Sequence, residues 1–198
     1  MKPHRSTQLW ILLLVLSPLA VAQNSEDPSG NDPNEGHISD GTYTSRFFGF
    51  TYKIPQGLLP HSTEFQQHVN DPSHPPTKTY VLFLAATPVR PYKNVAISAQ
   101  SAANFKDGAA YLEKVESSSR KLGLTVLDSA KQKALAGTTF FRQDYYSPQG
   151  TFFQTHACIL SKGYVLDFVI SANDRADVEK LFDSLNALQF GKPFDNVR

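Results

Sequence analysis

Apolar residues recur along this chain in two patterns, one typical of helices and one typical of strands. Residues 107–122 and 174–188 place apolar side chains three, four or seven positions apart, which puts them on one face of a helix. Those side chains are Tyr111, Leu112, Val115 and Leu122 in the first segment, and Val178, Leu181, Phe182, Leu185 and Leu188 in the second. The sequence therefore predicts two principal helices, with Gly123 ending the first and Asn173 or Asp174 capping the second.

Segments rich in aromatic and β-branched residues predict the strands. They are residues 43–48, 50–54, 79–87, 94–100, 124–136, 138–146, 151–160 and 164–172. The first two flank Gly49 and fit either one bent strand or a tight hairpin. The last four are separated by short connections, which predicts an antiparallel meander. The chain is therefore predicted to be an α+β protein.

The first 22 residues have the three parts of a secretory signal peptide. Lys2 and Arg5 form a basic start, residues 9–16 are apolar, and residues 20–22 (Ala-Val-Ala) are the small-x-small pattern that a signal peptidase cuts. A membrane-spanning helix is disfavoured, because Pro18 interrupts a stretch shorter than the roughly 20 residues that cross a bilayer. We expect the mature chain to be exported, to the periplasm or the medium, without stable membrane insertion.

Composition divides the mature chain into a leader, one domain and a tail. Residues 23–41 are almost wholly polar, with Ile38 as their one large apolar residue, so we expect a disordered leader. Residues 42–190 are predicted to form a single domain, and residues 191–198 a C-terminal tail. Cys158 is the one cysteine, so no intramolecular disulfide can form and the domain depends on its apolar core.

Removing the signal peptide would change the formal charge only slightly. Lys2 and Arg5 leave with it, so 19 − 2 = 17 basic residues face 18 acidic ones, a net charge of −1. A near-neutral chain lacks the basic patch by which proteins bind nucleic acid or anionic membranes. We expect a monomer with no nucleic-acid partner.

Three stretches of the predicted domain have a recognisable form. Residues 50–57, FTYKIPQG, match an aromatic-x-x-x-(Ile/Leu)-Pro-x-Gly opening. Residues 163–168 match a Gly-Tyr-hydrophobic strand, and residues 181–190 a Leu-x-x-Leu-x-Phe ending. In this order they resemble the PsbP-like group over residues 42–190. The resemblance implies an α/β/α sandwich with a central, mainly antiparallel sheet, and a non-catalytic accessory or adaptor role.

A long polar loop, residues 58–77, carries the first candidate for chemistry. The candidate metal ligands are His61, Glu64 and His68, with Asp71 and His74 nearby. On a short helix the first three would share one face, and imidazole and carboxylate ligands suit zinc or copper. Their spacing is not that of a His-Glu-x-x-His site, so a solvated polar loop is the alternative. A metal site here would support a metal-dependent hydrolase; otherwise we expect no cofactor.

The predicted strands offer two further sets of candidates. His156 and Cys158 lie two residues apart and share one face of a strand, and they are the residue types of a thiolate nucleophile. A lone cysteine among apolar neighbours is, however, typical of a core. The other set is Asp128, Asp144 and Asp167, on three different strands. They either converge as paired carboxylates for glycoside chemistry, or face water or pair with an arginine such as Arg142.

Adjacent aromatic residues recur in the predicted strands. They are Phe47, Phe48, Phe50, Phe140, Phe141, Tyr145, Tyr146, Phe152 and Phe153. Neighbours on a strand point to opposite faces, so each pair places one ring on either side of the sheet. The rings form core if helices cover both faces, and an exposed binding surface if one face is open.

These patterns favour a binding protein over an enzyme. We expect an exported, non-catalytic binding or accessory module that recognises a protein partner or a small ligand through the sheet face or the 58–77 loop. The metal-dependent hydrolase with His61, Glu64 and His68 is the alternative. A structural subunit of an envelope complex is a third hypothesis.

Overall fold

The computed structural model describes residues 32–34, 36–61, 79–149 and 151–191. The predicted signal peptide, about half of the predicted leader, residues 62–77 of the predicted loop and the tail after residue 191 therefore lie outside the described residues. Within the described ranges, no helix has the length and apolar character that crossing a bilayer requires.

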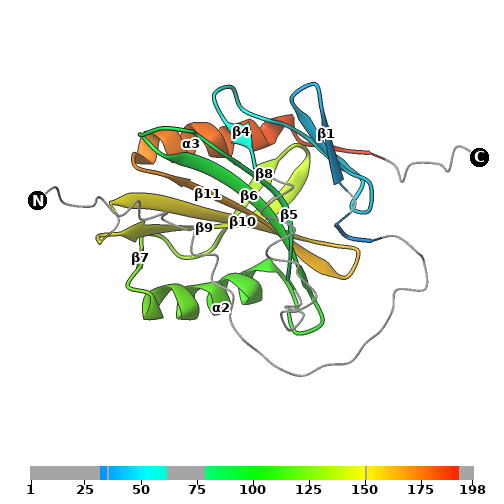
Figure 1. Ribbon diagram of the computed structural model, residues 1–198. Coiled ribbons are helices and arrows are strands. Elements are labelled where there is room, and N and C mark those ends of the chain that lie inside the picture. The colour runs from blue at the N-terminus through cyan, green and yellow to red at the C-terminus, as the bar shows by residue number, and fades with distance from the viewer. Residues whose placement is uncertain (1–31, 35, 62–78, 150, 192–198) are drawn as a thin grey trace, which may run out of the picture.

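Two antiparallel sheets form the framework of the described residues (Figure 1). The larger sheet has eight strands, in the order β4-β5-β6-β11-β10-β9-β7, with β8 also paired to β9. The smaller sheet has four strands, in the order β1-β2-β3-β12. The strands are β1 Gly36–Ser39, β2 Thr42–Ser45, β3 Phe50–Lys53, β4 Leu59–Pro60, β5 Thr79–Ala86, β6 Lys93–Ser101, β7 Thr125–Val126, β8 Lys131–Leu135, β9 Thr138–Ser147, β10 Phe152–Ser161, β11 Tyr164–Ala172 and β12 Gln189–Phe190.

Both helices begin after an aspartate that caps them. Helix α2 (Gly108–Lys121) follows Asp107, whose carboxylate accepts a hydrogen bond from a first-turn main-chain N–H at 2.9 Å. Helix α3 (Arg175–Ser184) follows Asp174, which does the same at 2.6 Å, and the 3-10 turn η1 (Leu185–Ala187) continues it. Such caps satisfy N–H groups that have no partner inside the helix. The two predicted helices are confirmed, and the second is shorter because it tightens into η1.

The helices lie against opposite faces of the larger sheet (Figure 1). Neighbouring residues of a strand point to opposite faces. In β10, Ala157 belongs to the core cluster that includes α3, whereas Cys158 belongs to the cluster that includes α2. In β11, Leu166 and Val165 divide in the same way. The smaller sheet adds its buried aromatic rings to the α3 side. The α+β class with a mainly antiparallel sheet is confirmed.

The strand pairing settles two open points of the prediction. Strands β2 and β3 pair antiparallel, so the segments around Gly49 form a hairpin and not one bent strand. Strands β9, β10 and β11 pair in sequence order, which confirms the meander.

The ordered structure begins earlier than the predicted domain start at residue 42. Residues 36–39 form β1, paired with β2, although the sequence assigned them to a disordered leader. The turn between them is Asp40-Gly41, both with positive φ, which is the geometry of a two-residue hairpin turn. Gly36 lies under the Tyr43 ring, where a Cβ atom would come within 2.4 Å of the hydroxyl. Main-chain pairing and this contact stabilise a segment that buries little apolar surface itself.

The prediction of a single strand at 124–136 is wrong, because this range forms two strands, β7 and β8. Val126 pairs with Tyr145 and Lys131 pairs with Arg142, so four residues, 127–130, stand opposite two. The two extra residues cannot fit a regular hydrogen-bond ladder, so the chain loops out between β7 and β8. Short strands β4 and β12 and the second sheet were not predicted either.

Candidate functional site

The predicted metal loop falls largely outside the described residues. His61 is described and exposed, and its main-chain N–H donates to the Leu84 carbonyl at 2.8 Å. Glu64 and His68, with Asp71 and His74, lie in the range 62–78 that the structure does not describe. Among the residues that it does describe, no group of three or more His, Cys, Asp or Glu side chains could hold a metal ion. The His61, Glu64 and His68 site stays a prediction.

His156 and Cys158 share the α2 face of the sheet, as predicted, but they do not form a nucleophilic pair. Nδ1 of His156 lies 2.7 Å from Asp167 Oδ2, so its partner is a carboxylate on the adjacent strand. The Cys158 thiol points at the Gly108 carbonyl, with Sγ 3.5 Å from that oxygen. Burial, and then the charge of Asp167, raise the pKa of the Cys158 thiol far above its usual value. The interpretation of Cys158 as a buried core residue is confirmed.

Asp167 is the centre of a buried polar cluster under α2. Besides His156, the Tyr111 hydroxyl donates to Asp167 Oδ2 at 2.9 Å, and Gln154 Nε2 lies 3.2 Å from His156 Nε2. Burial, and then Asp167, raise the pKa of Tyr111 well above its usual value, so this hydroxyl keeps its proton. The cluster joins α2 to β10 and β11, and its side chains are buried from solvent.

Asp144 and Asp167 lie on opposite faces of the sheet and Asp128 lies in the loop between β7 and β8, so the hypothesis of a glycoside site formed by all three is wrong. Asp144 pairs with Thr155 in the ladder and Asp167 pairs with Cys158. Thr155 and Cys158 lie three residues apart on β10, an odd number, so the two aspartates face opposite sides of the sheet.

Each of these carboxylates has a partner of its own. Asp128 is partly exposed and pairs with Lys131 at 3.0 Å. Asp144 pairs with Arg142 at 2.8 Å, which is the arginine pairing that the sequence offered as the alternative.

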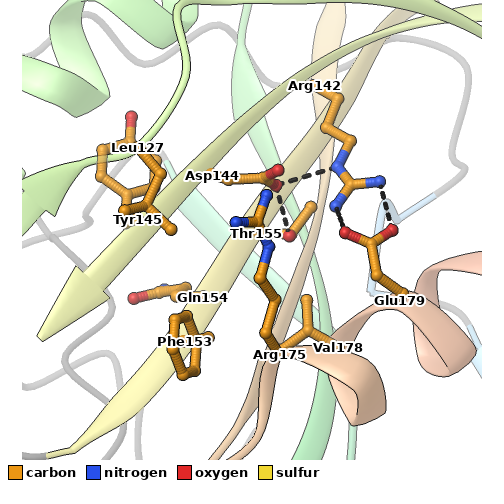
Figure 2. Close-up of a pocket in the computed structure, with 10 residues that line it drawn as sticks. All are labelled: Leu127, Arg142, Asp144, Tyr145, Phe153, Gln154, Thr155, Arg175, Val178 and Glu179. Carbon is orange, nitrogen blue, oxygen red and sulfur yellow. Dashed lines mark hydrogen bonds and ion pairs between the residues drawn. The ribbon is translucent and has the colours of Figure 1, made fainter.

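Arg142 holds an ion-pair cluster on the α3 face (Figure 2). Its Nη1 and Nη2 donate to the two oxygens of Glu179 in α3, at 2.9 and 2.6 Å, while Nε donates to Asp144 at 2.8 Å. Asp144 also accepts from the Thr155 hydroxyl at 2.6 Å. The guanidinium carbon lies 4.1 Å from the centroid of the Phe182 ring. Both carboxylates are engaged by the same cation, which stabilises the packing of α3 on the sheet.

A shallow hollow opens beside this cluster, and only about 10 Å³ of it is open to the centre of a water molecule. Its walls are Leu127, Arg142, Asp144, Tyr145, Phe153, Gln154, Thr155, Arg175, Val178 and Glu179 (Figure 2). Ligand pockets typically hold about 300–1,000 Å³. The hydrogen bonds from Arg142 hold the pKa of Glu179 below its usual value, so this carboxyl stays ionised at neutral pH. The hollow has room for about one water molecule, and the carboxylates of Asp144 and Glu179 in its wall are already paired with Arg142.

The predicted aromatic pairs are mainly core. Phe48, Phe50, Phe140 and Tyr145 are buried, while Phe47, Phe141, Tyr146, Phe152 and Phe153 are half-buried. Tyr146 and Phe153 stack on each other with centroids 4.9 Å apart. Because a helix lies on each face, the rings do not form an open aromatic sheet.

The loop between β5 and β6 is the part that sequence reasoning treated only as a turn. Residues 88–92 (Pro-Val-Arg-Pro-Tyr), here named the tip loop, are exposed without interruption. Val89 is 68% exposed and Tyr92 47%. The signal that would have marked it is a short segment in which Pro88 and Pro91 enclose Val89 and Arg90 and Tyr92 follows, because arginine and tyrosine are enriched where proteins bind each other.

No family model matches this chain, and no curated protein sequence does. Among solved structures, cyanobacterial PsbP (CyanoP) from Synechocystis sp. PCC 6803 matches with a TM-score of 0.54 and 14% identity, over 76% of this chain and 91% of that chain. The Ran-binding protein Mog1p of Saccharomyces cerevisiae matches with a TM-score of 0.46 and 11% identity, over 72% of this chain and 90% of that chain.

The likeness to the cyanobacterial protein concerns the fold, because the identity is only 14%. It agrees with the resemblance carried by residues 50–57, 163–168 and 181–190. The described part of this chain has a PsbP-like fold.

Proposed function

We propose that the protein is an exported, non-catalytic binding or accessory module, and that it recognises a protein partner. One observation carries the proposal. The reactive side chains of the described strands are engaged in contacts that stabilise the fold, whereas an ordered loop with apolar and cationic side chains stands in solvent.

The engaged groups are those that chemistry would need free. A nucleophilic thiol must reach its thiolate form near neutral pH, and burial opposes this at Cys158. Paired carboxylates for glycoside hydrolysis must lie about 5–10 Å apart around one bond. Asp144 and Asp167 face opposite sides of the sheet instead. These positions favour a structural role for all three residues.

A layered arrangement belongs to the same proposal. Helix α2 would form one layer, the larger sheet the second, and α3 with the smaller sheet the third, as in the α/β/α sandwich of the PsbP-like group. The accessory role that this resemblance implies agrees with a module whose surface, and not its interior, is functional.

Export is the second part of the proposal, and Trp10 offers a direct test. It is the one tryptophan of the chain and lies inside the proposed signal peptide, which we expect to be cut after Ala22. The exported protein should begin at Gln23 and should show tyrosine emission without tryptophan emission. Tryptophan emission from protein collected outside the cytoplasm, or an N-terminus at Met1, would contradict cleavage.

Native mass spectrometry tests the binding function. The full chain, tagged at its C-terminus, would be purified gently from the compartment to which its source cell sends it. We expect a complex with one protein partner that forms again, at fixed stoichiometry, from the two purified components. A chain carrying zinc or copper, with loss of the metal on replacing His61, Glu64 and His68, would instead support the metal-dependent hydrolase. A bare chain under all conditions would contradict the proposal.

A further inference from the structure

The tip loop is held in one conformation by hydrogen bonds at its base. The Thr87 hydroxyl donates to the Pro91 carbonyl at 3.1 Å and accepts from the Lys93 N–H at 3.0 Å. The Tyr92 N–H donates to Asn173 Oδ1 at 2.9 Å, which joins the loop to the start of α3. Two proline rings further restrict the backbone. A loop ordered in advance loses little conformational entropy when it binds, so its contacts contribute more to affinity.

The side chains that this base presents are of the kind found in protein interfaces. Val89 has the largest exposed fraction among the large apolar residues of the described part. The Arg90 guanidinium carbon lies 5.5 Å from the centroid of the Tyr92 ring, within the range of a cation–π contact, and both residues are exposed. Arginine and tyrosine are enriched in binding hot spots, and the exposed Val89 adds apolar surface next to them that a partner can bury.

Charge indicates the chemistry of the partner. Lys93, at the base of the loop, is already paired with Asp177 of α3 at 2.9 Å. Arg90 has no ion pair with any described residue, so its charge is available to a partner. We propose that the tip loop inserts Val89 into an apolar socket on a partner protein, and that a carboxylate at the rim of the socket binds Arg90. This inference rests on the proposed function and names the surface that performs it.

Other anionic partners fit the tip loop less well. A surface arginine contributes about 1 kcal/mol to binding an anionic membrane, so one free cation gives only weak attachment. Nucleic-acid binding at physiological salt depends on several phosphate contacts. A protein partner requires fewer charge contacts, because a socket that buries Val89 has to supply only one carboxylate to pair with Arg90. A five-residue loop buries less than the roughly 800 Å² per partner of a stable interface, so we expect the tip loop to supply only part of the interface of the complex.

Photo-crosslinking locates the contact in the full chain. Benzoylphenylalanine would replace Val89 in one variant and Leu160 in the control. Leu160 is 43% exposed and lies at the end of β10 beside the β10–β11 turn, at the opposite end of the sheet from the tip loop. We expect one partner protein to crosslink at position 89 and not at position 160. Crosslinks between two copies of the chain would overturn the inference.

Titration of the purified partner then tests the chemistry. We expect Val89→Ser and Arg90→Glu each to weaken binding about tenfold or more, because the first loses apolar burial and the second places two negative charges together. Lys53→Glu, an equal charge change at an exposed site on the smaller sheet, should stay within about twofold because rim charges remote from a contact contribute little. Thermal unfolding of each variant should match the wild type, since both altered loop residues are exposed.

The outcomes separate the two proposals. If a partner binds but Arg90→Glu and Val89→Ser bind it as the wild type does, the inference fails and the binding function stands. If anionic lipid vesicles bind the loop and no protein does, the inference fails. If no partner forms a complex with the wild type, the proposed function itself fails.

Discussion

The Arg142 cluster allows one stability prediction to be worked out in full. The perturbation is Arg142→Met, which keeps an apolar stem against Phe182 but removes the cation. The substitution leaves two carboxylates without their partner. Glu179 is 43% exposed and can be solvated, whereas Asp144 is only 13% exposed. The cost should therefore come mainly from Asp144.

The magnitude follows from this difference in exposure. Removing one member of a buried ion pair costs about 3–5 kcal/mol. We expect the lower end, about 3 kcal/mol, because Asp144 keeps the hydrogen bond from Thr155 at 2.6 Å. A loss of that size should lower the Tm by about 6–12 °C for a domain of about 150 residues. Urea unfolding followed by circular dichroism measures it, with an unchanged m-value showing that the same surface unfolds.

Two further variants test whether the cost of Arg142→Met comes from the unpaired charge of Asp144. Glu179→Gln should cost less than about 1 kcal/mol, because exposed ion pairs contribute little. Adding Asp144→Asn to Arg142→Met should recover about half of the loss, since no unpaired charge then remains in the sheet. An Arg142→Met variant within about 1 kcal/mol of wild type, or a Glu179→Gln variant that costs as much, would refute the account.

Three further predictions concern the helix contacts and the ionisable groups. Gly108→Ala should destabilise the protein by about 1–3 kcal/mol in urea unfolding, because the new Cβ atom would come within 2.7 Å of Phe141, whereas Ser117→Ala on the exposed side of α2 should not destabilise it. The Cys158 thiol should not react with Ellman's reagent at pH 8 until guanidinium unfolds the chain; reaction in the native state would contradict its burial. Arg142 lowers the pKa of Glu179 from 4.5, so its stabilising contribution should be complete above that pH and lost as the pH falls below it. The small difference between wild type and Glu179→Gln should therefore vanish in acid, and a difference that grows in acid would contradict the sign.

Local patterns predicted the helices and most strands because the information lies within each segment. Asp107 and Asp174 cap helices whose apolar residues recur at the helical period. The hairpin of β1 and β2 could also have been predicted from the sequence. Asp40-Gly41 is a dipeptide that favours the two-residue turn, but the polar residues around it indicated a disordered leader instead.

Contacts between segments far apart in the chain could not be predicted from the sequence. Arg142 and Glu179 are 37 residues apart, and their pairing depends on where α3 crosses the sheet. The separation of Asp144 from Asp167 depends on strand register, since a shift of one residue would bring both to one face. The exposure of Val89 depends on which parts of the fold cover the β5–β6 loop, and the spacing of apolar residues in the sequence does not predict this.

The central claim is that exposed tip residues, and not the reactive residues of the interior, perform the function. The most direct test measures the fraction of chain found in the partner complex by native mass spectrometry, for Val89→Ser/Arg90→Glu and for Cys158→Ala. We expect the tip variant to leave the complex and the Cys158→Ala variant to stay in it, with both variants folded by circular dichroism. A folded tip variant that stays in the complex, or a folded Cys158→Ala variant that leaves it, would show that the tip residues do not perform the function.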